Sequence, residues 1–332
     1  MKSLFLSLAL VGTVSLLDIG LGHLSLGGSY SYAYDLPLVQ KSLKAKEYDK
    51  VVGLLSPEVE KLDRQGLFAL AKAYSGLKKS EAAIKAYTAA LSLNPQDVEA
   101  KTLIGAEQIV SGKEKEALAT LKEALEMRSD FVPAYKLLIR IYEKRKNKYE
   151  LRLLYQDLVD KIGAKAEYLT KLCELNATDG LYDMAEKYCQ QGIEKNSKEP
   201  NNFVYLGVSR KGTGKTKEAE MILKKTADDF PKSALAQNIY AQSQEEKKNF
   251  ISSYAYYKKA IVADSKSVPG YMGLAQSALE IQKYQESLDA FEKTCHLDKT
   301  TLPAFRKATN TLRTMKIEEW LRKFEKKSDN CD

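Results

Sequence analysis

The segment 212–216, which reads Gly-Thr-Gly-Lys-Thr, contains the residue types that end a phosphate-binding loop. In such a loop, backbone N–H groups surround the phosphates and the lysine contacts them. The complete loop also needs a glycine five residues before Gly214, and that position is Ser209. A phosphate-binding loop lies between a strand and a helix, whereas this segment falls at the turn of a predicted helix pair. The sequence therefore argues against nucleotide binding.

Histidine is too scarce for the common catalytic and metal sites. The chain has two histidines, and only His296 lies beyond the N-terminal segment. It follows Cys295 and has no second ligand at a fixed spacing, so neither a two-histidine metal site nor a catalytic triad can be assembled. The acidic residues are spread over predicted helix surfaces. We predict no catalytic, cofactor-binding or metal-binding residue, no small-molecule substrate, and a protein that is not an enzyme.

The composition is that of a folded protein with an ample core. Of the 332 residues, 44% are hydrophobic and 29% are charged, a balance that argues against disorder. The formal net charge is +8, but basic and acidic residues alternate along the chain. This interleaving disfavours nucleic-acid binding, which needs a basic patch or stripe.

The first 33 residues differ from the rest of the chain. Lys2 is followed by an uncharged apolar run over 3–17, and 19–34 contains no Lys, Arg, Asp or Glu. This order is typical of a secretory signal peptide, with small-residue cleavage options at 20–22 and 31–33. Asp18 interrupts it, and the alternative is an uncleaved anchor of an array facing the cytoplasm, although the run is shorter than the roughly 20 residues of a spanning helix. We predict a signal peptide over 1–33 and export to a periplasmic or secreted location.

A 34-residue period organises the chain after the N-terminal segment. Units that start at residue 64 and repeat every 34 residues carry small residues at the eighth and twentieth places, and bulky apolar residues at the seventh and twenty-fourth. Two antiparallel helices approach closely only where small side chains face each other, and bulky neighbours fill the flanking space. Gly112, Gly180 and Gly214 all occupy the fifteenth place, where each pair needs its turn. Each unit is therefore predicted to be a helix–turn–helix.

This pattern resembles the tetratricopeptide repeat (TPR), a 34-residue helix–turn–helix. The best-matched unit carries the family's small and large residues at Leu70, Ala71, Tyr74, Ala83, Tyr87, Ala90 and Pro95. The resemblance covers 64–301, in seven units that start at 64, 98, 132, 166, 200, 234 and 268, after a degenerate first unit at 34–63. It implies an all-α fold, a right-handed α-solenoid of about eight TPR helix pairs. In two units the family's bulky fourth place holds Lys101 or Gln237, which predicts weaker packing there.

The residues 302–332 are predicted to form C-terminal capping helices. Ile317, Trp320, Leu321 and Phe324 form one apolar stripe on an otherwise charged helix. The last unit of a solenoid must cover its neighbour and present a polar face to water. The only tryptophan is therefore interpreted as structural.

The four cysteines fall into two candidate pairs. Cys173 and Cys189 occupy the eighth and twenty-fourth places of one unit, which face each other across an antiparallel helix pair. They are either two buried free thiols or, in an oxidising compartment, a disulfide. Cys295 and Cys331 form the second candidate pair, and a bond between them would attach the tail to the array.

In the family that the sequence resembles, the first helix of each pair lines a concave face along which ligands lie. The resemblance implies that a protein or peptide partner contacts the inward places of these helices. Those residues are Phe68, Lys72, Ile109, Lys136, Arg140, Glu174, Val204, Val208, Lys211, Asn238, Gln242, Met272 and Gln276. The set of Lys, Asn and Arg residues with which the family clamps a C-terminal carboxylate is absent, so a chaperone-tail receptor is disfavoured.

The turns within successive units are net basic, and Lys144, Arg145, Lys146 and Lys148 contribute most of that charge. Basic residues favour helix C-termini because of the helix dipole. The alternative is an edge that contacts an acidic surface, such as anionic lipid or an acidic protein. Together these features predict an exported, non-catalytic scaffold for protein–protein interaction.

Overall fold

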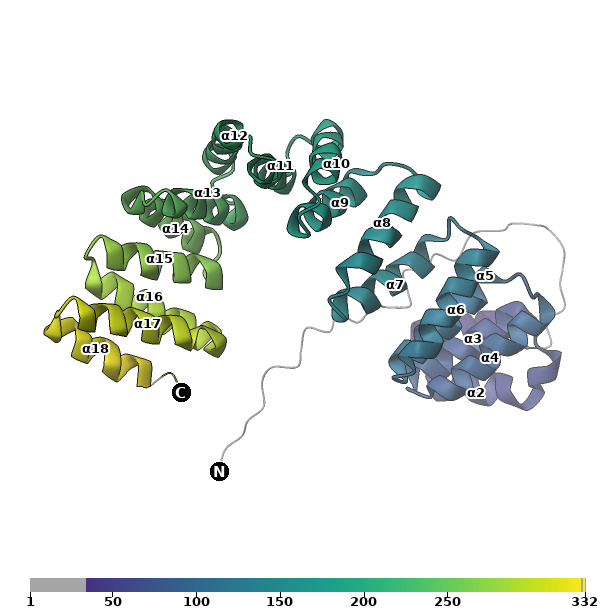
Figure 1. Cartoon of the computed structure of the whole chain (residues 1–332). Helices are drawn as coiled ribbons and strands as arrows, with labels where there is room; N and C mark the ends of the chain where they lie inside the picture. Colours follow the sequence, from purple (N-terminus) through teal and green to yellow (C-terminus); the bar gives the residue numbers. More distant parts are fainter. Residues whose placement is uncertain (1–33, 330, 332) are drawn as a thin grey trace, which may run out of the picture. The chain divides into compact units, whose positions relative to one another are not determined.

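The computed structural model describes residues 34–329 and 331, so the predicted signal peptide lies outside the described part of the chain. Within that part every regular element is a helix, and the all-α repeat fold predicted from the spacing is confirmed (Figure 1). The chain divides into two compact units, unit 1 up to Asn147 and unit 2 from Lys148. The division falls inside the 34-residue repeat that starts at 132, between its two helices.

Unit 1 consists of short helices followed by full-length helix pairs. Its elements are α1 (Leu36–Lys44), α2 (Tyr48–Leu55), the 3-10 helix η2 (Ser56–Lys61), α3 (Arg64–Gly76), α4 (Ser80–Leu93), α5 (Val98–Val110), α6 (Glu114–Met127) and α7 (Val132–Lys144). Its core includes Val51, Leu70, Ala83 and Tyr87, which are buried between successive helices.

Unit 2 contains the remaining helices. They are α8 (Lys148–Ile162), α9 (Ala166–Thr178), α10 (Tyr182–Lys195), α11 (Pro200–Gly212), α12 (Thr216–Asp229), α13 (Ala234–Glu246), α14 (Phe250–Ala263), α15 (Val268–Glu280), α16 (Tyr284–Leu297), the 3-10 helix η3 (Lys299–Thr301), α17 (Leu302–Thr314) and α18 (Glu318–Asp329). From α3 onward, each odd-numbered helix begins at a residue where the 34-residue spacing places the start of a repeat or of the capping segment. None of the described helices is long and apolar enough to cross a membrane.

In each of the seven repeats that start at 64 to 268, the turn has one backbone position with positive φ, and it is the fifteenth place. Glycine occupies it in three repeats, as at Gly214 with φ of +83°. Elsewhere a lysine or glutamine holds the same left-handed conformation, as at Lys248 (φ 59°) and Gln282 (φ 61°). This conformation ends a helix by satisfying its last carbonyls, and glycine is the residue that adopts it without steric cost.

Small residues allow the paired helices to approach closely. A Cβ atom added to Gly207 on α11 would lie 2.6 Å from Leu223 Cδ2 on α12. Gly105 and Leu121 stand in the same relation on α5 and α6, where the added atom would be 2.8 Å from the leucine. The eighth and twenty-fourth places therefore touch across the pair, as the alternation of small and large residues predicts.

The two departures at the fourth place each have a polar partner. Gln237 is fully buried, and its Nε2 donates to the carbonyl oxygen of Ala227 (2.5 Å) at the end of α12. Lys101 is half-buried and forms an ion pair with Glu123 on α6. Each residue thus exchanges apolar packing for a hydrogen bond or ion pair to the neighbouring helix.

The C-terminal helix α18 covers the last repeat of unit 2. Phe324 is fully buried against Phe291 (ring centroids 6.2 Å apart) and Phe305 (5.8 Å). Trp320 is half-buried beside Tyr284, with ring centroids 5.8 Å apart. The apolar stripe of α18 therefore faces the core, which agrees with a structural role for the only tryptophan.

Candidate interaction surface

In unit 1, the first helices of successive repeats lie side by side with matched ends. At the start of α3, Arg64 donates from Nε to Asp97 Oδ2 (2.5 Å) and from Nη2 to Glu99 Oε2 (2.6 Å). At the end of α3, Ser75 donates to Glu107 near the end of α5. These contacts fix α3 and α5 as parallel neighbours, and α7 packs next to α5 and α6.

Asp97 combines a helix cap with an ion pair. Its Oδ1 accepts from the backbone N–H of Ala100 (3.0 Å), which caps α5, while Oδ2 accepts from Arg64. Burial on its own would raise the pKa of Asp97. The hydrogen bonds from Arg64 and the backbone outweigh burial, so its pKa lies below the ordinary value.

Five of the residues predicted to contact a partner lie on unit 1, and we call them the unit 1 face: Phe68, Lys72, Ile109, Lys136 and Arg140. The ring of Phe68 lies under the Arg64 guanidinium (4.0 Å to the centroid) and edge-on to Tyr87. Lys72 follows Phe68 by one turn of α3, and Ile109 is half-buried at the end of α5. Lys136 and Arg140 are exposed, one turn apart on α7.

The unit 2 residues of the predicted surface differ from one another in exposure and in whether they have a partner. Lys211 forms an ion pair with Glu246, and Glu174 with Lys171 (3.0 Å). Asn238 donates from Nδ2 to Ser267 Oγ (3.0 Å). The two glutamines are exposed and the other two apolar residues are half-buried: Gln242, Gln276, Val208 and Met272.

Val204 differs from the other predicted contact residues. It is fully buried and packs in a core cluster with Leu223, Ala236 and Tyr240. The fifth place of this repeat therefore points into the core of unit 2. Val204 is not part of the surface in this structure.

Unit 2 also has an open hollow of about 550 Å³ at the first turns of α9 and α11. Its lining consists of Lys165, Ala166, Glu167, Thr170, Lys171, Asn196, Glu199 and Asn201. Most of these residues lie in or next to the turns between repeats, so the inward places of the helices do not predict them. The signal that could have found them is the clustering of polar residues around the repeat boundaries at 166 and 200.

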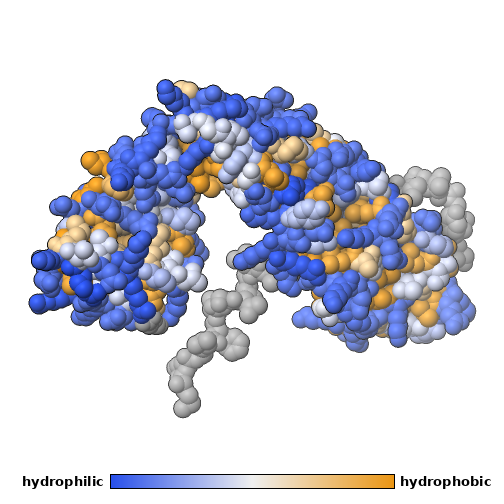
Figure 2. Space-filling view, viewed as in Figure 1, coloured by the Kyte–Doolittle hydropathy of each residue, from blue (hydrophilic) through white to orange (hydrophobic). Residues whose placement is uncertain are grey.

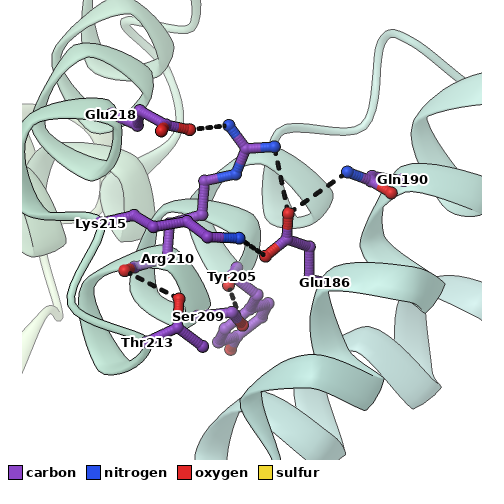
Figure 3. Close-up of polar contacts among 8 residues, drawn as sticks. All are labelled: Glu186, Gln190, Tyr205, Ser209, Arg210, Thr213, Lys215 and Glu218. Atoms are coloured by element: carbon purple, nitrogen blue, oxygen red, sulfur yellow. Dashed lines mark hydrogen bonds and ion pairs between the residues drawn. The ribbon is translucent and has the colours of Figure 1, made fainter.

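The Gly-Thr-Gly-Lys-Thr segment forms the turn between α11 and α12, as predicted, and helices flank it. Figure 3 shows Arg210 between two carboxylates, with Nη2 3.1 Å from Glu186 Oε1 and Nη1 2.6 Å from Glu218 Oε2. Lys215 donates to the other oxygen of Glu186 (3.3 Å). The lysine of the segment is therefore engaged in joining α10 to the next repeat.

The basic turn residues are largely paired. Lys144 and Arg145 both contact Glu114, at 3.5 and 2.6 Å, and Lys148 contacts Asp179 (3.4 Å). Burial of Glu114 is too slight to offset the hydrogen bond from Arg145, and its pKa is lowered. Much of the positive charge at this turn is therefore balanced within the protein.

The structure records both cysteine pairs as disulfides: Cys173–Cys189 joins α9 to α10, and Cys295–Cys331 joins α16 to the second residue after α18. All four side chains are buried. No cluster of three or more potential metal ligands occurs among the described residues. His296 lies 3.9 Å from Glu292 on the surface of α16.

Figure 2 shows hydrophilic residues over most of the visible surface, with hydrophobic residues mainly between the helices of each unit. The surface also carries scattered exposed apolar side chains, such as Val262, which is 86% exposed at the end of α14. Exposed apolar residues that stand alone are normal on a soluble domain. What distinguishes the predicted surface is the recurrence of its places from helix to helix.

The family model of the tetratricopeptide repeat matches residues 65–97. No curated protein matches the chain significantly in sequence. A tetratricopeptide repeat protein from Parabacteroides merdae has a similar structure, with a TM-score of 0.54 and 17% identity over 79% of this chain and 98% of that chain. At this identity the likeness shows the fold.

Two further solved structures are similar over parts of the chain. Yeast Tom70 gives a TM-score of 0.49 at 17% identity, over 92% of this chain and 72% of that chain. YrrB, described as a TPR protein with an unusual peptide-binding site, gives 0.44 at 18% identity, over 56% and 96%.

Proposed function

Since the chain is a tetratricopeptide-repeat protein, we propose that it is an exported, non-catalytic scaffold that holds a partner polypeptide on the first helices of its repeats. The repeat fold is suited to protein–protein interaction, because successive equivalent helices form an extended surface. The fold does not by itself name a function, so the proposal rests on the residues that the surface carries.

The observation that supports a binding surface is the contrast between core places and exposed places. The eighth place is small in most repeats, as at Ala71, Gly207 and Ala275, because it packs against the partner helix. The ninth place changes from Lys72 to Gln242 between repeats, although it lies on the same helices. A scaffold specific for one partner needs a constant core with variable side chains on its surface.

Export is supported by two independent features. The segment 1–33 has the order of a signal peptide, and both cysteine pairs lie close enough to be bonded. Disulfides persist in oxidising compartments and are rare in the cytoplasm. A membrane-anchored array facing the cytoplasm is the alternative, and in it the four cysteines would be thiols.

A contact between the basic turn and an acidic surface is a secondary part of the proposal. Lys144 has a side chain that is 81% exposed, so it can reach a partner despite its contact with Glu114. Because Arg145 and Lys148 are paired as well, we expect this contact to be weak. Reversing the charges of Lys144, Arg145, Lys146 and Lys148 together should change partner binding by less than reversal of the unit 1 face.

The experiment for the proposed function is chemical crosslinking of the native protein in cells, followed by mass spectrometry. Lysine-reactive reagents report both the partner and the site, because Lys72 and Lys136 lie on the unit 1 face while Lys85 and Lys122 lie on α4 and α6. Envelope or secreted partners, together with a new N-terminus between about 23 and 34, are expected. An intact Met1 with cytoplasmic partners would establish the anchored alternative.

A further inference from the structure

We infer that the unit 1 face binds an acidic segment of a partner polypeptide in which carboxylate side chains flank an apolar one. This inference rests on the proposed function and specifies the chemistry of the partner at one part of the surface. It follows from three features of α3, α5 and α7: unpaired positive charge, partly exposed apolar side chains, and the spacing of parallel helices.

The positive charges of the face have no ion-pair partner in the part of the chain that the structure describes. Lys72, Lys136 and Arg140 form no ion pair with any described residue. Glu143, one turn after Arg140, is also exposed and is the one carboxylate on the same side of α7. The face therefore stays net positive, and a partner carboxylate can pair with it without displacing an internal contact.

Two basic residues on the same helices, Arg64 and Lys101, are already neutralised. Arg64, which precedes Phe68 by one turn, is held by Asp97 and Glu99. Lys101 is paired with Glu123 on the next helix. On α3, α5 and α7 the charge that is left to attract an acidic chain is therefore that of Lys72, Lys136 and Arg140.

Apolar side chains lie among these charges. Phe68 and Ile109 are half-buried, and Val110 is 70% exposed at the same end of α5 as Ile109. Removing apolar area from water favours binding, so a segment with one apolar residue gains from contact here. A partner that carried only charge would leave this area exposed to water.

The distance between the helices determines how far apart the two carboxylates of the partner segment should be. Adjacent packed helices lie about 8–10 Å apart, and an extended chain rises about 3.3 Å per residue. From α3 to α7 is two such steps, which corresponds to about five or six residues of extended chain. The segment should therefore carry two carboxylates about six residues apart, with an apolar residue midway that lies over α5.

The test uses three synthetic peptides that share an apolar central residue and differ at two positions six residues apart. Those positions hold Glu, Gln or Lys, and binding to the full chain is measured by fluorescence anisotropy. The Glu peptide should bind about tenfold more tightly than the Gln peptide, and the difference should shrink as the salt concentration rises. Equal binding of the Glu and Gln peptides, or none by the Glu peptide, would overturn the inference.

Variants of the protein locate the effect. The pair Lys136→Glu and Arg140→Glu should remove the preference for the Glu peptide, whereas the matched pair Lys85→Glu and Lys122→Glu, on α4 and α6, should preserve it. Thermal unfolding by circular dichroism checks that both variants are folded. Loss of the preference in both pairs, or in neither, would contradict a site on the unit 1 face.

Two further outcomes separate this inference from its alternatives. Binding of the chain to vesicles with anionic lipid, lost in Lys136→Glu and Arg140→Glu while no peptide binds, would replace the acidic segment by a membrane surface. A partner that is crosslinked to Lys72 or Lys136 but binds the charge-reversed variant unchanged would refute this inference and leave the proposed function standing.

Discussion

Arg64 donates two hydrogen bonds to Asp97, from Nε to Oδ2 over 2.5 Å and from Nη2 to Oδ1 over 3.2 Å, and thereby joins the start of α3 to the residue that caps α5. The side chain of Asp97 is only 4% exposed, while that of Arg64 is 46% exposed. One carboxylate thus orders a helix end and sets the register between neighbouring repeats. That register positions the exposed side chains of the unit 1 face.

Substitution of Asp97 separates the cap from the ion pair. Asp97→Asn keeps a good capping residue and should lower the free energy of unfolding by about 1 kcal/mol, because the half-exposed arginine is screened by water. Asp97→Ala loses the cap as well and should lower it by about 2 kcal/mol. Urea unfolding measures both, and equal losses would show that the cap contributes nothing.

The Asp97 carboxylate should also make the stability of the protein depend on pH. Because the folded-state pKa of Asp97 is depressed, its contribution to stability is complete above the unfolded value near 3.9 and is lost as the pH falls through the folded value. The stability difference between the parent chain and Asp97→Asn should therefore shrink below about pH 4. A difference that stayed constant down to pH 2 would contradict the ion pair.

Close packing between α11 and α12 makes Gly207 sensitive to a single methyl group. Gly207→Ala should lower the free energy of unfolding by about 1–3 kcal/mol, because the new Cβ would overlap Leu223. Gly53→Ala on α2 is the matched control. Its Cβ meets nothing within 4 Å, so removal of a helical glycine should stabilise by about 0.5–1 kcal/mol. If both substitutions stabilised the protein, the eighth place would not be a tight contact.

At the fifteenth place, introducing a glycine should stabilise the protein. Gln282 adopts φ of 61° without being glycine, so Gln282→Gly should raise the free energy of unfolding by about 1 kcal/mol. Gly214→Ala at the equivalent place should lower it by a similar amount. Thermal unfolding of the two variants tests the pair, and a loss of stability in Gln282→Gly would count against the left-handed turn.

The bond between Cys173 and Cys189 closes a loop with a sequence separation of 16. Loss of such a cross-link lowers the free energy of unfolding by about 3 kcal/mol. In a background that lacks Cys295 and Cys331, a reductant should lower the Tm of the protein, and it should have no effect once Cys173 and Cys189 are alanine. Detection of free thiols at all four positions of the protein isolated from its cells would rule out both disulfides and weaken the case for export.

The sequence predicts the repeat fold well because close helix packing demands small residues at fixed places. Helix starts such as Val98 and Ala234 fall where the 34-residue spacing puts the first residue of a repeat. The hydrogen bond of Gln237 could not be predicted from the spacing. As a polar residue at a bulky place, Gln237 predicts loose packing, but its side chain donates to the end of the preceding helix, and only the three-dimensional neighbour reveals that bond.

The division after Asn147 has a signal in the sequence that is easily overlooked. In the repeat that starts at 132, the eighth and twentieth places hold Ile139 and Leu151, whereas most repeats have small residues there. The candidate site could be predicted only in part, because the period fixes which places face outward but not which side chains find partners. Lys211 and Lys136 occupy comparable surfaces, yet only Lys211 is paired, because Glu246 lies within its reach.

The measurement that tests the central claim most directly is site-specific photo-crosslinking in cells, with a reactive side chain at Lys136 or Gln242 and, as matched controls, at Lys122 or Met221. Lys136 and Gln242 lie on the first helices of their repeats, while Lys122 and Met221 are exposed on the second helices α6 and α12. We expect one polypeptide to be captured from the first-helix positions and not from the controls. Capture from the second helices alone, or from all four positions equally, would contradict it.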